Sequence, residues 1–492
     1  MTKQYRPWAP DQAFLLPPSP AEWLPEGHLA FFILEVVQEL DIRAIESVLQ
    51  DKDPRGERPY SPRMMTALIL YAYCAGIFSS RKIERATYED VALRVIAGGG
   101  HPHFTSVNRF RLEHRKALSA LFVQVLKLCA RAGLKTVGHV ALDGSKVQAN
   151  ASKHKAMSYE RMNSDEKRLE KEIAALMQKA DEIDAAEDAE HGAEMRGDEI
   201  PDELRHRESR LRKIREAKAE LEKEAAEARA ARLRENAESL RKKMDDGTAP
   251  ARERRAAATL AAKAEKQAEQ ISPRSDDDDD SAGGCGAMQL PLHRVPNTPE
   301  GKPKDSAQRN FTDPGSRIMI RNAVFLQAYN AQAAVSLDQI ILAHGLTNNP
   351  TDAEQLPPML ERVLANTGAR PVIVTADSGY LSEANITYCA KNGVDAYIAL
   401  RKVDAEKMTQ VPSTEALIAH WDMREKVTSP RGKRIYALRK ILIEPVFGQI
   451  KAAMGFRHFS LRGLDKAASE WGIVCVCHNL LKLFRATRPA LP

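Results

Sequence analysis

The sequence predicts an α/β fold, a mixed sheet with flanking helices, together with a helical N-terminal domain and a coiled-coil hairpin insertion. Two short apolar runs rich in β-forming residues stand directly before Asp143 and Asp377. From residue 311 onward, three consecutive strand-like runs are followed by alternating strands and helices, which is typical of a mixed sheet with helices on its faces. Helical periodicity dominates residues 1–135 and 151–246.

Length and charge limit the organisation of the chain and its partners. The 492 residues predict two or three domains, because hydrophobic cores rarely grow beyond about 250 residues. The formal charge of +6 is uneven, since residues 276–280 are all Asp while residues 431–451 are distinctly basic. This asymmetry favours a polyanion over a membrane as partner. Because neither a signal peptide nor an apolar run of roughly 18 residues is present, we expect a cytoplasmic protein.

Residues 1–135 read as a helical N-terminal domain. A helix is expected to start at Pro62, and a later one, capped by Thr105 or Ser106, is expected to end at Gly133. A short helix, a tight loop and a basic helix indicate a helix-turn-helix-like unit that contacts DNA. Its exposed face would carry Arg109, Arg111, His114, Arg115 and Lys116. A plain helical bundle with a solvated basic face is the alternative.

Residues 151–246 predict a charged coiled-coil insertion. Apolar residues recur at 4-3-4-3 spacing in the first half and more loosely in the second, at Leu169, Ile173, Leu176, Ala180 and Ile183 and then at Leu211, Ile214, Leu221 and Ala225. Gly192, Gly197 and Pro201 break the pattern between them, so we expect an antiparallel hairpin, with pairing between chains as the alternative. Residues 247–310 have little to bury and are expected to form a disordered linker.

The sheet domain is expected to combine residues 136–150 with residues 311–485. After the strand before Asp143, the strand-like runs are 318–320, 323–335, 339–345, 371–376 and 396–400, and the helices are 352–365, 382–392 and 439–455. Sites in such sheets lie beyond the carboxyl ends of strands, and Asp143 and Asp377 stand at two such ends. Glu444 lies on the last helix.

Two Asp at strand ends and one Glu on a helix could surround one or two divalent cations, which is how proteins build metal sites for phosphodiester chemistry. Each acid alone also has a structural interpretation, for example Asp377 as the cap of the following Ser-Gly-Tyr turn. Asp352 begins a helix, so we interpret it as an N-cap or a residue near one. Cys475 and Cys477 lie in an apolar helical run and are interpreted as packing residues, not metal ligands.

Several separated motifs add a resemblance to a known family. LDGSKVQANAS, TDPGSRIM, YNAQAAV, TADSGY and EPVFGQIK, in this order, together resemble bacterial insertion-sequence transposases of the DDE type, whose catalytic core is RNase H-like. The resemblance runs from about Leu16 to Leu483. It implies that Asp143, Asp377 and Glu444 are the catalytic triad and hold two Mg²⁺ (or Mn²⁺) ions. It also implies terminal inverted repeats and target DNA as partners, with a homodimer or larger assembly in the DNA complex.

The region around Glu444 resembles the family pattern of a Tyr, a basic residue, the Glu and a Lys. Tyr436, Glu444 and Lys451 fill three positions, while either Arg439 or Lys440 takes the basic one. Lys451 is expected to contact a DNA phosphate. Pro445 is comfortable only in the first turn of a helix, so we expect the helix to start at Glu444 or to kink there.

Three functional hypotheses follow. The first is a transposase that cleaves transposon ends with water and joins the freed 3′-OH to target DNA. The second is a nuclease or resolvase on the same core, which hydrolyses but never joins. The third is an inactive transposase relic or repressor that binds DNA without catalysis, and the presence of all three acids argues against it.

Overall fold

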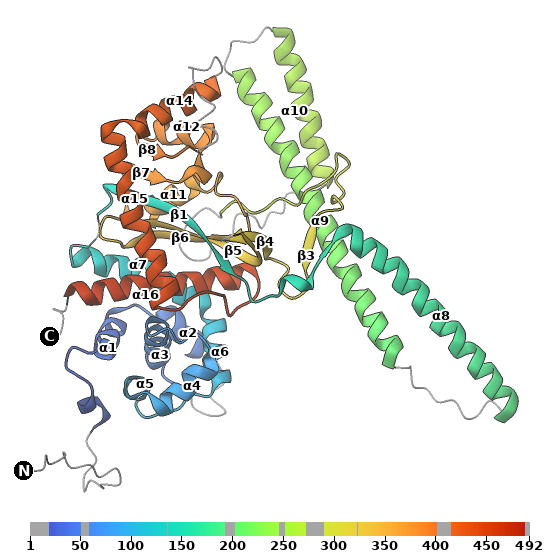
Figure 1. Ribbon diagram of the computed structural model, residues 1–492, viewed down its shortest axis with the longest axis horizontal. Helices are drawn as coiled ribbons and strands as arrows, with labels where there is room; N and C mark the ends of the chain where they lie inside the picture. The colour runs from blue at the N-terminus through green and yellow to red at the C-terminus, as the bar shows by residue number, and fades with distance from the viewer. Residues whose placement is uncertain are drawn as a thin grey trace, which may run out of the picture.

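The structure is a computed structural model that describes residues 19–50, 59–134, 136–191, 202–245, 251–271, 290–321, 323–400 and 415–487. A mixed sheet lies at the centre, the N-terminal helices pack below it, and long helices project to one side (Figure 1). The mixed sheet with flanking helices that the sequence predicts is therefore confirmed. None of the described helices is both long enough and apolar enough to cross a membrane.

The sheet has the strand order expected of an RNase H-like core. β5 pairs antiparallel with both β1 and β6, whereas β1 and β7, and then β7 and β8, pair in parallel. β4 forms a hairpin with the first part of β5. The strands are β1 (His139–Gln148), β4 (Arg317–Arg321), β5 (Val324–Val335), β6 (Ile341–Thr347), β7 (Ile373–Ala376) and β8 (Asp395–Ile398).

The register of the two central strands brings two acids together. In the parallel ladder Leu142 pairs with Ala376, so the next residues, Asp143 and Asp377, emerge side by side. β7 stops there, but β1 continues to Gln148 because it still pairs with β5. The prediction that Asp143 ends its strand is therefore wrong. Asp143 lies within β1, at the point where the parallel neighbour β7 ends.

The N-terminal domain is helical, and its helix α3 is buried at every residue from Met65 to Cys74. α3 and α7 both contact the long C-terminal helix α16. The helices are α1 (Leu29–Glu39), α2 (Arg43–Gln50), α3 (Pro62–Cys74), α4 (Ser80–Glu89), α5 (Val91–Ile96), α6 (Phe104–Glu113), α7 (Arg115–Arg131) and α16 (Leu464–Thr487).

A buried polar cluster ties the two parts into one body. Glu470 of α16 is fully buried and accepts hydrogen bonds from the backbone N–H groups of Ser460 and Leu461, at 2.9 and 3.1 Å. Tyr73 of α3 donates to the same carboxylate at 3.3 Å, and Arg111 donates to the Tyr73 hydroxyl at 3.0 Å. Buried charges persist only when they are paired and hydrogen-bonded, so this contact fixes α3, α6 and α16 relative to one another.

Three predictions for the N-terminal domain are wrong. The single helix expected up to Gly133 is divided at His114, whose side chain is buried against Phe110 with ring centroids 4.6 Å apart. The cap of α6 is His103, whose ring accepts from the Thr105 N–H at 3.4 Å. Arg111 was expected on the exposed basic face but is 4 % exposed, because its guanidinium bonds within the core.

The insertion contains three long helices, α8 (Tyr159–His191), α9 (Asp202–Asp245) and α10 (Ala251–Ile271). α8 packs on the first part of α9 through Leu169, Leu211 and Ile214, as the predicted hairpin requires. α10 packs along the later part of α9 (Figure 1), so the prediction of disorder is wrong for residues 251–271. Alanine-rich helices can approach closely with few large apolar residues, and Ala261 and Ala268 are buried here.

The rest of the expected linker is partly ordered as well. Residues 308–310 form strand β3, which pairs with β2 (Ala156–Ser158) at the base of the insertion. Arg309 in β3 forms ion pairs with Glu220 and Glu224 of α9. The acidic run at residues 276–280 lies outside the described residues.

Candidate active site

Asp143 and Asp377 share one cationic partner, Arg439. The Arg439 Nη2 atom donates to Asp143 Oδ2 at 2.9 Å and lies 3.8 Å from Asp377 Oδ2. The other oxygen of each carboxylate accepts a backbone N–H, from Gly144 at 2.8 Å and from Gly379 at 2.9 Å. Each carboxylate is therefore oriented by a backbone N–H that follows it closely in sequence, and turns its other oxygen toward a common positive charge.

The electrostatics of this pair leave negative charge in excess. The pKa of Asp143 is raised to about 6, mainly by burial; Arg439 lowers it, and the carboxylates of Asp377 and Asp352 contribute to the increase. One guanidinium thus does not fully compensate the carboxylates around it. Hard oxygen ligands with uncompensated charge are the donor set that Mg²⁺ and Mn²⁺ prefer, so Asp143 and Asp377 fit such an ion.

Asp352 joins the site from the opposite face of the sheet. Its Oδ1 atom accepts from Asn330 Nδ2 at 2.6 Å and from Gln332 Nε2 at 2.7 Å, and lies 3.5 Å from Lys146 Nζ. A Cβ atom at Gly144 would come within 2.6 Å of the same oxygen, so a side chain at that position would displace this carboxylate.

The interpretation of Asp352 as an N-cap is wrong, because α11 (Leu356–Thr367) is preceded by Gln355 at the N-cap position. The signal that could have found its role is the motif YNAQAAV. Asn330 and Gln332 alternate with apolar residues in the buried part of β5, residues 327–335, and buried amides require polar partners. Tyr380 completes this network by donating to Gln332 Oε1 from the turn after Asp377.

Glu444 is not brought to the two Asp. It lies on an exposed face of α15 (Pro430–Gly448), whose buried face carries Arg439 to the carboxylates. Within the described ranges, no three His, Cys, Asp or Glu side chains are grouped closely enough to hold a metal ion. Of the three acids expected to form one site, Asp143 and Asp377 lie together, whereas Glu444 lies away from them.

The helix that carries Glu444 begins at Pro430, so the prediction that it starts at Glu444 is wrong. Pro445 lies inside α15, where a proline leaves the carbonyl four residues earlier without its helical partner. That carbonyl belongs to Ile441, and it accepts instead from Gln339 Nε2 at 2.9 Å. Beyond Gly448 the helix widens into the π-helical segment η5 (Gln449–Ala453). Such segments are frequent at functional sites.

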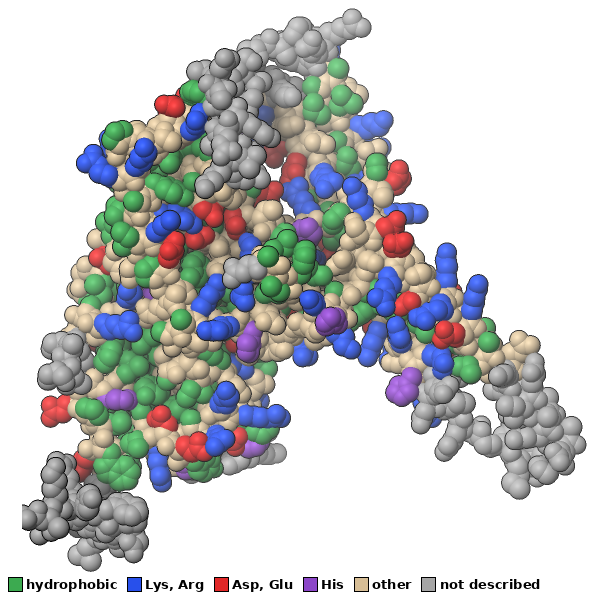
Figure 2. All heavy atoms as spheres, in the orientation of Figure 1, with side chains coloured by type: hydrophobic (Ala, Val, Ile, Leu, Met, Phe, Trp, Pro, Cys, Tyr) green, Lys and Arg blue, Asp and Glu red, His purple; other side chains and the backbone are tan. Residues whose placement is uncertain are grey.

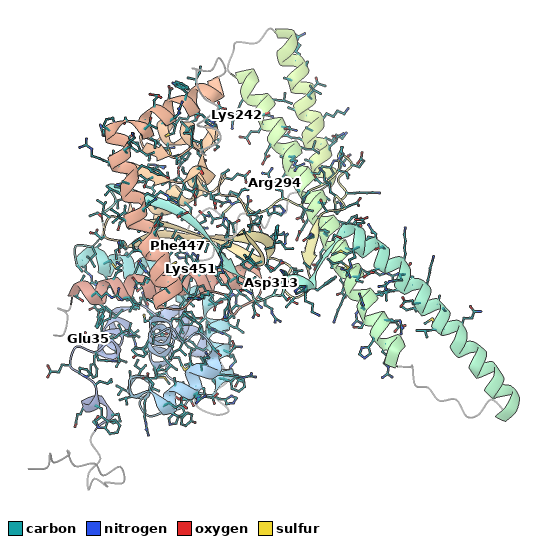
Figure 3. The ribbon with its side chains drawn as sticks, in the orientation of Figure 1. Glu35, Lys242, Arg294, Asp313, Phe447 and Lys451 are labelled. Atoms are coloured by element: carbon teal, nitrogen blue, oxygen red, sulfur yellow. The ribbon has the colours of Figure 1, made fainter. Side chains whose placement is uncertain are left out.

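The basic and aromatic residues of the family pattern occupy distinct places. Arg439 is 8 % exposed and contacts the acids, whereas Lys440 is exposed on the helix surface. Tyr436 is half-buried, and burial raises its pKa while Arg439 lowers it. Lys451 donates to Ser145 of β1 and lies 5.7 Å from the Phe447 ring centre, where α15 crosses the sheet (Figure 3). In the N-terminal domain, Arg109 is exposed.

The cysteine cluster is buried in the core. Cys475, Cys477 and His478 of α16 have no exposed surface. Burial lowers the pKa of His478 to about 4, and its ring lies 3.0 Å from the Gln339 carbonyl oxygen. These side chains pack between α3 and the sheet.

Two family models match the chain. Residues 306–480 match the model described as a transposase DDE domain, and this range contains Asp377, Arg439 and Glu444. Residues 19–113 match the model described as a transposase domain (DUF772), which covers helices α1 to α6. Asp143 lies outside both ranges. Searches of the curated proteins and of the solved structures give no match.

Proposed function

The chain belongs to the insertion-sequence transposases with a DDE domain, and from this premise we propose that it cleaves the ends of transposon DNA and joins the freed 3′-OH to target DNA. The observation that carries the proposal is the pair of carboxylates at adjacent strands, each with one oxygen held by a backbone N–H and one turned toward a shared cation. Positioning by the sheet is what two-metal phosphodiester chemistry asks of a protein.

In this mechanism Asp143 and Asp377 would hold divalent cations, Mg²⁺ or Mn²⁺, and Glu444 would supply the third carboxylate if a rotation of α15 turned it toward the sheet. When bound, the cations make a water nucleophilic and stabilise the leaving 3′-oxygen. Arg439 would compete with such ions for the carboxylate oxygens, since its guanidinium lies between the two acids. Once displaced, Arg439 is well placed to bind a phosphate of the DNA.

The DNA contacts proposed for the catalytic domain lie on α15 and its extension. Lys451 in η5 contacts Ser145, which lies two residues beyond Asp143 on the same face of β1. Lys440 and Tyr436 lie on α15. Arg109 on α6 is a candidate contact in the N-terminal domain, whereas Arg111 is withdrawn from that role because it is buried.

The test uses two substrates carrying the terminal inverted repeat of the element. One is an intact end and the other is a pre-cut end with a free 3′-OH, and each is incubated with Mg²⁺ and a target duplex. A transposase cleaves the first and joins the second to target DNA. Cleavage without joining would assign a nuclease or resolvase, and binding without either reaction would assign an inactive relic.

A further inference from the structure

A cavity of about 870 Å³ lies between the end of β1, the segment that follows it, the β4–β5 hairpin and residues 458–462. Its described lining contains no Asp or Glu. Six side chains that are cationic or can become so line it: Lys153, His154, Lys155, Arg321, His458 and Arg462. A concave surface lined by one sign of charge concentrates ligands of the opposite sign.

The β4–β5 hairpin adds an apolar tip to this basic cavity. Val324 and Phe325 line the cavity and are 59 % and 57 % exposed, and Ile320, which pairs across the hairpin with Phe325, is 60 % exposed. Ala323 in the turn has a φ of 61°, a conformation that costs a non-glycine residue about 1 kcal/mol or more. Hydrophobic side chains gather among Lys, Arg and His on the face shown in Figure 2. A cluster of large apolar side chains exposed to solvent is typical of an interaction surface.

Arg321, which lines the cavity, links it to the candidate active site. Arg321, at the end of β4, donates to the Lys146 carbonyl oxygen at 3.1 Å, three residues beyond Asp143 on β1. Burial and then the charge of Arg321 lower the pKa of Lys451, so the two cations are close, and Lys451 in turn contacts Ser145. A line of positive charge therefore runs from the carboxylates into the cavity.

We propose that this groove binds a short unpaired stretch of the DNA strand next to the cleaved bond. Phe325 and Val324 pack against a base that has left the helical stack, and the cations bind the phosphates on either side. The inference rests on the proposed function, since it takes DNA as the ligand. An unpaired strand fits better than a duplex, because base faces reach an aromatic side chain only when they are unstacked, while a duplex would set the apolar tip against phosphates.

The test measures the affinity of the full-length protein, without divalent metal, for a fluorescent oligothymidine strand and for a duplex of mixed sequence. Phe325→Ala should weaken binding of the single strand by about 5- to 150-fold, the range for loss of stacking on one base, and leave duplex affinity unchanged. Phe325→Trp should retain the affinity for the single strand. Val324→Ala should weaken it less than Phe325→Ala, and the matched control Val372→Ala, 63 % exposed away from the groove, should change neither affinity.

Several results would overturn the proposal: no binding of the single strand, an equal loss for both ligands in Phe325→Ala, no loss at all, or tighter binding of an oligouridine RNA. Circular dichroism shows whether Phe325→Ala folds, and Val324→Ala tests the same surface if it does not. The end-cleavage assay is independent of this one. If the protein does not cleave transposon ends but binds the single strand as expected, the proposed function is wrong and the proposed groove stands. If it cleaves but does not bind the single strand, only the proposal for the groove is wrong.

Discussion

The two strand acids and the helix acid are held in different ways. Asp143 and Asp377 follow a paired position in a parallel ladder, so backbone hydrogen bonds set their separation before any ligand arrives. Glu444 stands on α15, where a rotation of the helix about its axis would change which side chain faces the sheet. In this structure the helix presents Arg439. Half of the site is therefore built into the sheet, and the other half depends on one helix.

The backbone of α15 is less regular than that of the strands, which would favour a rotation of this helix. Pro445 removes one backbone hydrogen bond, Gln339 supplies a substitute from outside the helix, and η5 departs from α-helical geometry. A proline within the helix and a π-helical segment are both known causes of helix kinks. β1 itself has no comparable interruption, since its pairing with β5 continues through Asp143 to Gln148.

The largest expected effect is on cleavage. Asp143→Asn, Asp377→Asn and Glu444→Gln should each lower the rate of end cleavage by about 10³-fold or more, because neutral amides bind a hard cation poorly. Single-turnover cleavage with Mg²⁺ measures this, and DNA affinity measured in parallel should be unchanged. Glu425→Gln, an exposed acid on α14 (Glu415–Thr428), is the control. If Glu444→Gln cleaves like wild type while both Asp variants are inactive, the third carboxylate is elsewhere and Asp352 is the next candidate.

The next effect concerns stability and pH. Because burial raises the pKa of Asp143 from 3.8 to about 6, its protonated form stabilises the folded state at low pH, and this contribution is lost as the pH rises through about 6. The free energy of unfolding should fall by about 1.4 kcal/mol per pH unit across this window, or about 3 kcal/mol in all. Urea unfolding between about pH 4 and about pH 7 measures it.

Asp143→Asn sharpens that experiment, since the amide cannot ionise. The variant should lose this pH dependence and be more stable than wild type near neutral pH, although it is inactive. Glu425→Gln should keep the wild-type slope. An unchanged slope in Asp143→Asn would show that the ionised carboxylate is already well compensated in the folded protein.

A third prediction separates the two adjacent cations of α15. Arg439→Gln should lower the free energy of unfolding by about 1–3 kcal/mol, because it removes a charge-assisted hydrogen bond from a buried pair. The same change should raise the affinity for Mn²⁺, measured by titration calorimetry, by about tenfold or more, since one competing positive charge is gone. Lys440→Gln is the exposed control and should leave both quantities near wild type. Equal Mn²⁺ affinities in the two variants would place the ion away from Asp143 and Asp377.

The parts predicted from sequence are those fixed by local pattern. Apolar runs before Asp143 and Asp377 predict buried strands, and the order of elements predicts the mixed sheet. The register that places Asp143 and Asp377 side by side is consistent with these patterns, but only the observed pairing of β1 with β7 establishes it. Glu444 shows where such reasoning stops, because its orientation depends on which face of α15 is buried, and that is decided by long-range contacts such as Arg439 with Asp143.

The missed features are non-local as well. Asp352 has its role only because Asn330, Gln332 and a glycine on the neighbouring strand surround it. α10 was missed because it packs through alanine and has few large apolar residues. Arg111 was expected to be exposed because nothing near it in sequence reveals the partner hydroxyl on α3. Helical period identifies a helix, but it does not identify the residues that the helix will contact.

The smallest expected effect tests whether α15 is held from outside. Gln339→Ala removes the donor to the Ile441 carbonyl and also the acceptor of Lys482, and should lower the free energy of unfolding by about 0.5–1.5 kcal/mol per bond lost. Lys482→Ala is the matched control, since it removes the second bond and leaves the first. If the bond to Ile441 restrains the helix that carries Glu444, Gln339→Ala should change the cleavage rate several-fold more than Lys482→Ala does. Mn²⁺ affinity, which depends on the strand acids, should be the same in both. An identical cleavage rate in the two variants would show that α15 takes its position from its own packing, and the contrast between a fixed half and a movable half of the site would then rest on η5 and Pro445 alone.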